Sequence, residues 1–124
     1  MTRAGGGLGR ACALALAARG AIVLVYDLSG ARDGSGSSHS AAEIVVGEIR
    51  AAGGEALANG ALVTDFIAVQ AIVPQAVEAW GRVDILVNNA GILRDKTFAK
   101  MQLADFELVL DVHLMGAVHC TKSV

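Results

Sequence analysis

Hydrophobic residues in the first part of the chain form two continuous runs and one helix-spaced stripe. The run at residues 8–19 is apolar almost throughout and stops at Gly20, which predicts a buried helix. A β-branched run at residues 21–26, closed by Asp27, predicts a strand covered on both faces, as in a parallel sheet. Apolar positions three and four residues apart at residues 41–52 predict a second helix.

The middle of the chain carries a weaker strand signal and then an interrupted helix. Residues 55–59 are interpreted as a short strand, and Thr64 or Asp65 can cap the helix that follows. That helix extends to Trp80 on a stripe of apolar residues. Pro74 lies inside it and predicts a kink or a break.

A third strand and a long last helix complete the pattern. Residues 83–88 form an apolar run that predicts a third buried strand, and the apolar spacing at residues 103–124 predicts a long helix. Because strands alternate with helices throughout, the sequence predicts an α/β fold with a doubly wound, Rossmann-like parallel sheet. We interpret residues 1–124 as one domain, because no repeat or boundary interrupts them.

The composition argues against several classes of function. The chain has 124 residues with a formal net charge of −2, so we expect no nucleic-acid partner. No apolar run reaches the roughly 18 residues of a membrane span, so we expect no membrane association. Cys12 and Cys120 lie far apart and outside any metal-ligand spacing. We therefore expect no metal site, and free thiols in a cytoplasmic protein.

A glycine cluster runs into the first predicted helix. It includes Gly5, Gly7 and Gly9, with Leu8 between the last two. Backbone without a Cβ can approach a pyrophosphate closely, and a helix N-terminus offers free N–H groups and a positive dipole end. The cluster therefore predicts a phosphate-binding loop; taken alone, a flexible tail is the alternative.

Asp27 ends the next predicted strand, about 20 residues after the glycines, the separation found in dinucleotide-binding folds. A carboxylate there can accept both ribose hydroxyls of adenosine and repel a 2′-phosphate, which favours NAD over NADP. The alternative is an aspartate that only caps the strand end.

Small and amide side chains lie at the end of the third predicted strand: Asn88, Asn89, Ala90 and Gly91. Ligands of such sheets bind beyond the carboxyl ends of the strands. Small residues there admit a cofactor, and an Asn amide can bridge neighbouring backbones. An ordinary turn is the alternative, since Asn and Gly favour turns.

Three features together resemble the short-chain dehydrogenase/reductase family, whose pattern is T-G-x-x-x-G-x-G followed by N-N-A-G: Thr2 with Gly7, Leu8 and Gly9; the strand end at Asp27; and Asn88 to Gly91. The resemblance covers essentially the whole chain. Within the family, residues 29–40 and 91–98 look like the dehydrogenase unit of type 2 peroxisomal multifunctional enzymes and their bacterial relatives. This resemblance implies oxidation of a 3-hydroxyacyl-CoA with NAD.

Three residues depart from the family pattern. Arg3 stands where the family has the first glycine of its phosphate loop, and a bulky side chain there is expected to clash with the turn or the cofactor. Ala61 stands where many members have an Asp near the adenine. His113 stands where many members have an Asn that supports the proton relay, and the multifunctional branch often has His. His113 is thus a candidate support residue, or alternatively an ordinary residue on an apolar helix stripe.

The catalytic Ser and Tyr-x-x-x-Lys of the family have no counterpart in this sequence. The single tyrosine, Tyr26, lies in a predicted strand, and Gly30 is found four residues later. Without that tyrosine, no group exchanges a proton with the substrate hydroxyl. The strand that the family places before Thr2 and the C-terminal half are also absent. We therefore expect a partial NAD-binding domain, inactive alone and without a catalytic residue.

The leading hypothesis is the NAD-binding portion of a dehydrogenase that oxidises a 3-hydroxyacyl-CoA-like alcohol by hydride transfer. The full-length parent is expected to be a homo-oligomer. One alternative is a 3-ketoacyl carrier-protein reductase fragment using NADPH, against which Asp27 argues. The others are a non-catalytic nucleotide-binding remnant, or an interaction protein that pairs through its last helix.

Overall fold

The computed structural model describes residues 1–27 and 40–124. Residues 29–39, which carry part of the resemblance to the multifunctional enzymes, lie outside the described residues. Within the described parts, the sheet consists of two parallel strands, β1 (Val23–Tyr26) and β2 (Ala56–Asn59). Val23 lies opposite Ala56, and the pairing continues in register to Tyr26 opposite Asn59. Both of these strands were expected from the sequence.

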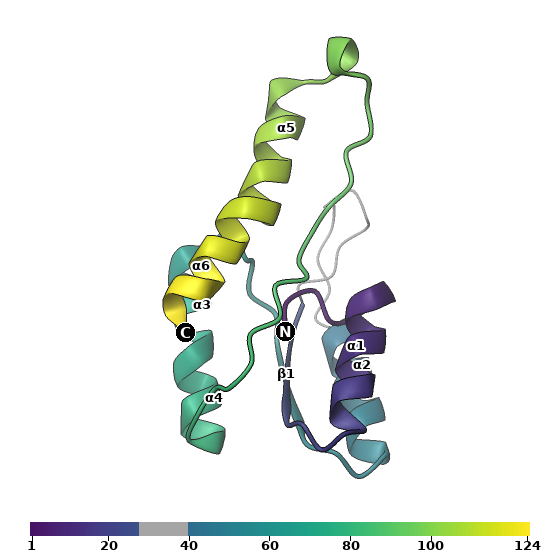
Figure 1. Ribbon diagram of the computed structural model, residues 1–124, viewed down its shortest axis with the longest axis vertical. Helices are drawn as coiled ribbons and strands as arrows, with labels where there is room; N and C mark the ends of the chain where they lie inside the picture. Colours follow the sequence, from purple (N-terminus) through teal and green to yellow (C-terminus); the bar gives the residue numbers. More distant parts are fainter. Residues whose placement is uncertain (28–39) are drawn as a thin grey trace.

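Helices cover both faces of this sheet (Figure 1). On one face, α1 (Gly7–Ala17) and α2 (Ser40–Ala51) pack a core that includes Val23, Val25 and Ile49. On the other face, a smaller cluster joins Tyr26 to Val69 and to Cys120 of the last helix. The alternation of β1 between the two clusters explains its continuous apolar run and confirms the α/β class.

The helix expected from residue 65 onward is two helices. Asp65 caps α3 (Phe66–Gln70), because its carboxylate accepts a hydrogen bond from the Ala68 N–H at 3.0 Å. A new helix, α4 (Ile72–Trp80), then begins, and Pro74 lies in its first turn. Proline is tolerated there because a first-turn N–H has no intrahelical acceptor. Gly81 ends α4 with a left-handed φ of 82°.

The last helix forms as expected and extends away from the sheet (Figure 1). A short 3-10 turn, η1 (Phe98–Lys100), precedes α5 (Leu103–Leu110). A π-helical segment, η2 (Asp111–Met115), joins α5 without a break to α6 (Gly116–Ser123). The α6 end packs on α3, whereas α5 exposes large apolar side chains such as Leu103 and Phe106.

Two expectations of burial and structure are wrong. Residues 83–88 do not form a strand, and none of them is buried. Within the described chain, their one backbone–backbone hydrogen bond runs from the Thr2 N–H to the Val87 carbonyl. A strand requires a neighbouring backbone along its length. In α1, only Gly9 and Ala13 are buried, because α2 and the sheet cover one side of that helix.

Candidate functional site

The glycine loop leads directly into the N-terminus of α1. Gly6 precedes the helix in an extended conformation, and no side chain caps the first turn. No acidic residue lies in that turn either, and the side chain of Leu8 is 73 % exposed. The first-turn N–H groups and the positive end of the helix dipole therefore have no anionic partner among the described residues. This arrangement suits a phosphate group.

Two glycines of the loop are required by close packing. A Cβ on Gly9 would lie 2.1 Å from the Arg3 carbonyl oxygen and 2.7 Å from Nδ2 of Asn89. A Cβ on Gly5 would lie 2.6 Å from Oδ2 of Asp27. Because these distances are shorter than any normal contact, the loop adopts this conformation only with glycine at both positions.

Thr2 ties the glycine loop to residues 88–91. Its buried hydroxyl oxygen accepts hydrogen bonds from the N–H groups of Asn89 and Ala90, each at 2.8 Å. In return, the Asn89 amide donates to the carbonyls of Thr2 and Arg3 at 3.2 and 3.1 Å. Asn88 instead donates its amide to the Thr121 hydroxyl of α6 at 3.1 Å. The two loops and α6 are thereby held in fixed positions.

Asp27 lies at the carboxyl end of β1 with its side chain directed at the glycine loop. Oδ2 accepts a hydrogen bond from the Gly5 N–H at 2.6 Å, and the residue is 5 % exposed. Burial raises the pKa of the carboxyl, while the Gly5 hydrogen bond and the charge of Arg3 act in the opposite direction. The structure thus brings together the carboxylate and the loop expected to bind adenosine and pyrophosphate.

Arg3 adopts a backbone conformation that favours glycine. Its φ is 48°, in the left-handed region where a side chain is disfavoured. Its guanidinium donates a hydrogen bond to the carbonyl of Gly91, so the side chain spans from the glycine loop to residues 88–91. The strain at this position therefore lies in the backbone conformation of Arg3. Its side chain lies between the glycine loop and residues 88–91.

His113 contacts the end of the same segment. Its Nε2 lies 3.0 Å from the Ile92 nitrogen and 2.9 Å from the Ile92 oxygen. A Cβ on Gly91 would lie 2.8 Å from the His113 ring. His113 is exposed, and its Nε2 is directed at the backbone of Ile92.

The other expectations from the sequence concern Ala61, metal binding and membrane association. Ala61 packs against the cluster around Tyr26, and its N–H donates to the Asn59 side chain at 3.0 Å. The part of the chain that the structure describes contains no group of His, Cys, Asp or Glu residues able to hold a metal. None of the described helices is both long and apolar enough to cross a membrane.

Sequence reasoning did not foresee two of the contacts that build the site. In the sequence, Thr2 is only the first residue of the glycine motif, whereas in the structure its hydroxyl oxygen accepts hydrogen bonds from the Asn89 and Ala90 N–H groups. The sequence predicts a clash at Arg3 but not its bond to Gly91. No local pattern predicts the Thr2 contacts, because the Asn89 N–H that its hydroxyl accepts from lies 87 residues away in the sequence.

A glycine-lined helix N-terminus beside a carboxylate at the tip of a parallel strand is the arrangement of a nucleotide-binding α/β protein. The chain matches the family described as short chain dehydrogenase over residues 1–124. It therefore belongs to the short-chain dehydrogenase family, an oxidoreductase family.

Individual relatives agree with this assignment. The chain is 54 % identical over 123 residues to the peroxisomal multifunctional enzyme type 2 of Drosophila melanogaster, covering 99 % of this chain and 20 % of the relative. It is 42 % identical over 124 residues to a 3-oxoacyl-[acyl-carrier-protein] reductase of Synechocystis, covering all of this chain and 47 % of the reductase.

A solved structure also matches closely. The crystal structure of a short chain dehydrogenase from Mycobacterium avium superposes with a TM-score of 0.87 at 48 % identity, covering 98 % of this chain and 43 % of the other. The chain thus spans less than half the length of each of these three proteins. The resemblance to the multifunctional branch, inferred from the motifs, is confirmed.

Proposed function

We propose that this chain binds the adenosine and pyrophosphate portion of NAD, and that it is the cofactor-binding part of a dehydrogenase. The observation that carries the proposal is the 2.6 Å hydrogen bond between Asp27 and Gly5, which brings the strand-tip carboxylate against the glycine loop. The domain assignment over residues 1–124 and the site residues given above form part of the same proposal.

The residues present fit a dinucleotide. Gly6 and Gly7 have no atom within 4 Å of an added Cβ, so the loop backbone is open on that side. The uncapped N-terminus of α1 would hold the pyrophosphate, and Asp27 would accept the adenosine ribose hydroxyls. When bound, NAD supplies the hydride acceptor; the chain's own residues bind and orient it.

Asp27 is the basis for proposing NAD in preference to NADP. A carboxylate at this strand tip repels a 2′-phosphate, and its burial leaves little solvent to screen that repulsion. Arg3 lies close enough to influence Asp27, but its guanidinium is directed to the Gly91 carbonyl.

For the parent reaction we propose oxidation of a 3-hydroxyacyl-CoA-like alcohol within a homo-oligomer. The support is the higher identity to the multifunctional enzyme, 54 % against 42 % for the carrier-protein reductase. The reductase reaction with NADPH is the second candidate. Because the sequence contains no Tyr-x-x-x-Lys, we expect this chain alone to bind cofactor without turnover. The cytoplasmic location stays a prediction.

The experiment is a titration of the purified chain with NADH and NADPH, followed by the fluorescence of the reduced nicotinamide. We expect saturable binding of NADH, weaker binding of NADPH, and no oxidation of a 3-hydroxyacyl-CoA with NAD. Tighter binding of NADPH would favour the reductase alternative, and measurable alcohol oxidation would contradict the assignment of an inactive chain.

A matched pair of variants separates cofactor binding from folding. Leu8→Glu places a carboxylate in the first turn of α1, where it stabilises the helix by about 0.3–1 kcal/mol but repels a pyrophosphate. Val77→Glu places the same charge on α4, where Val77 is 43 % exposed and α4 lies across the sheet from α1 (Figure 1). We expect NADH binding to weaken at least about tenfold in Leu8→Glu only, since 1.4 kcal/mol of repulsion suffices for that factor.

A further inference from the structure

Arg3 is held between the two loops of the proposed cofactor site. Its backbone packs against Gly9 in the first turn of α1, and its carbonyl accepts a hydrogen bond from the Asn89 amide at 3.1 Å. Its partly buried side chain continues toward residues 88–91, where the guanidinium donates to the Gly91 carbonyl. A positive charge is therefore fixed beside the N-terminus of α1.

The glycine loop lies between Asp27 and residues 88–91. Thr2, at the start of this loop, pairs in parallel with Tyr26 on one side and donates its N–H to the Val87 carbonyl at 3.0 Å on the other. Dinucleotides in this class of fold lie across the carboxyl ends of the strands. A ligand that extends from Asp27 toward residues 88–91 therefore passes the Arg3 side chain.

The charge of Arg3 also acts at the tip of β1. Burial raises the pKa of Asp27, whereas the Gly5 hydrogen bond and the charge of Arg3 lower it. The guanidinium thus lies within electrostatic reach of Asp27 while it contacts Gly91.

Arg10, the other arginine beside the glycine loop, is engaged elsewhere. It lies in α1 and donates to both carboxylate oxygens of Glu48 on α2, at 2.6 and 3.3 Å. Arg3 instead donates to a carbonyl, which is an uncharged acceptor. Because a hydrogen bond to an ionised oxygen is roughly twice as strong as one between neutral groups, a phosphate is the better acceptor for this guanidinium.

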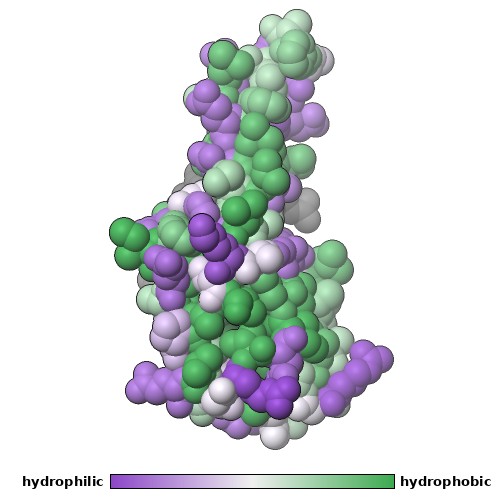
Figure 2. Space-filling model, turned by 60° about the vertical axis from the view of Figure 1, so that its left-hand side comes forward, coloured by the Kyte–Doolittle hydropathy of each residue, from purple (hydrophilic) through white to green (hydrophobic). Residues whose placement is uncertain are grey.

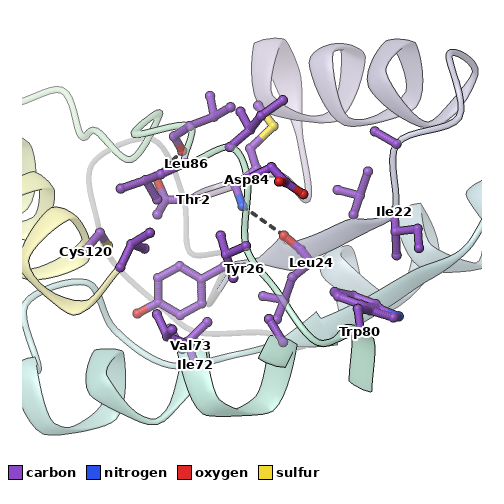
Figure 3. A pocket seen from close by; sticks show the side chains of 18 of the residues that line it. Thr2, Ile22, Leu24, Tyr26, Ile72, Val73, Trp80, Asp84, Leu86 and Cys120 are labelled. Carbon is purple, nitrogen blue, oxygen red and sulfur yellow. Dashed lines mark hydrogen bonds between the residues drawn. The ribbon is translucent and has the colours of Figure 1, made fainter. Parts of the chain in front are cut away.

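The cavity between β1, α4 and residues 82–87 does not suit a phosphate (Figure 3). It has a volume of about 510 Å³, its walls are mainly apolar, as at Leu24, Ile72 and Leu86, and none of residues 3–9, 27 and 88–91 lines it. Apolar side chains gather on this side of the molecule (Figure 2). Because burial of an unpaired charge among apolar groups is costly, the pyrophosphate belongs at the glycine loop.

We propose, on the basis of the cofactor function proposed above, that Arg3 binds the pyrophosphate, with its guanidinium exchanging the Gly91 carbonyl for phosphate oxygens. The N-terminus of α1 supplies N–H groups and about half a positive charge. Arg3 adds a full charge and a planar pair of donors that matches a phosphate group. Gly6 and Gly7 leave open space on the loop for that group. The arginine at a glycine position of the family pattern thus acts as a ligand of the cofactor.

The test is calorimetric titration of the whole chain with ADP-ribose and with adenosine, before and after Arg3→Gln. Glutamine keeps an N–H donor for the Gly91 carbonyl and the same backbone strain at a φ of 48°, but it removes the charge. We expect ADP-ribose to bind at least about tenfold more weakly to the variant. Adenosine, which has no phosphate, should bind both proteins equally. Arg3→Lys keeps the charge without the planar donors, so its affinity for ADP-ribose should lie between the two.

Arg19→Gln is the matched control. It removes the same charge at the other end of α1, roughly 15 Å from the first turn at 1.5 Å per residue and beyond the Debye length of about 8 Å. We expect it to leave ADP-ribose binding unchanged. Added NaCl should weaken ADP-ribose binding more in the unmodified chain than in Arg3→Gln, since salt screens the charge that the variant lacks.

The outcomes separate this inference from the proposed function. Equal or tighter binding of ADP-ribose by Arg3→Gln would overturn the inference and leave the cofactor site standing. An equal loss for adenosine and ADP-ribose would show that Arg3 only holds the loops together, and a loss confined to 2′-phosphorylated ADP-ribose would place Arg3 at the ribose; either result would also overturn it. No binding of ADP-ribose by the unmodified chain would contradict the proposed function itself, and the inference with it.

Discussion

Replacement of Thr2 by valine tests how the two loops of the site are joined. Valine keeps the shape of the side chain but removes the oxygen that accepts the Asn89 and Ala90 N–H groups at 2.8 Å. A typical intramolecular hydrogen bond contributes about 1 kcal/mol, and a donor left unpaired inside the protein raises that loss. Two such bonds therefore give a loss of about 2–3 kcal/mol in the free energy of unfolding.

The corresponding shift in melting temperature is large enough to measure. With an unfolding entropy of about 2.1 cal/mol/K per residue, a chain of this length loses about 10 °C for that change in free energy. The assay is thermal and urea unfolding followed by circular dichroism. Thr2→Ser keeps the hydroxyl and loses one methyl, so we expect a loss of about 1 kcal/mol.

A second control removes a hydroxyl that makes no such bonds. Thr97 is exposed and its side chain does not cap the following turn, so Thr97→Val is expected to change stability by less than about 0.5 kcal/mol. If Thr2→Val melted within a few degrees of the unmodified chain, or no lower than Thr2→Ser, the hydroxyl would not be the joint between the loops.

Three further changes follow from the same structure. Gly9→Ala puts a Cβ 2.1 Å from a backbone oxygen and should lower stability by about 1–3 kcal/mol in urea unfolding, whereas Gly6→Ala, with open space, should not. Tyr26→Phe removes a buried hydroxyl without a partner among the described residues, so the urea midpoint should rise. Burial raises the pKa of Asp27, so its stabilising contribution is present below the ordinary aspartate pKa and is lost as pH rises through the raised value. We expect Asp27→Asn to abolish this decrease in stability, measured as the urea midpoint of unfolding from pH 3 to 7. A pH profile unchanged by the substitution would contradict this reasoning.

Much of the fold could be predicted from local sequence because local physics determines it. Val23 and Val25 lie in a continuous apolar run and form a strand with one core cluster on their side of the sheet. Gly81 ends a helix because it adopts a left-handed conformation without strain. Asp27 was placed by its position at the end of that strand, and the structure directs it to the glycine loop.

The remaining features depend on partners that a local pattern does not reveal. Residues 83–88 have the composition of a buried strand, but a strand forms only where another backbone lies alongside, and here Thr2 alone does. Pro74 was expected to interrupt one helix, whereas the chain begins a second helix just before it. The bond from Arg3 to Gly91 joins residues 88 apart in sequence.

The most direct test of the central claim is calorimetric titration of the chain with ADP-ribose and with its 2′-phosphorylated form, before and after Asp27→Asn. We expect one site for ADP-ribose, at least about tenfold weaker binding of the phosphorylated form, and a smaller difference between the two in the variant. Absence of ADP-ribose binding, or tighter binding of the phosphorylated form by the unmodified chain, would contradict it.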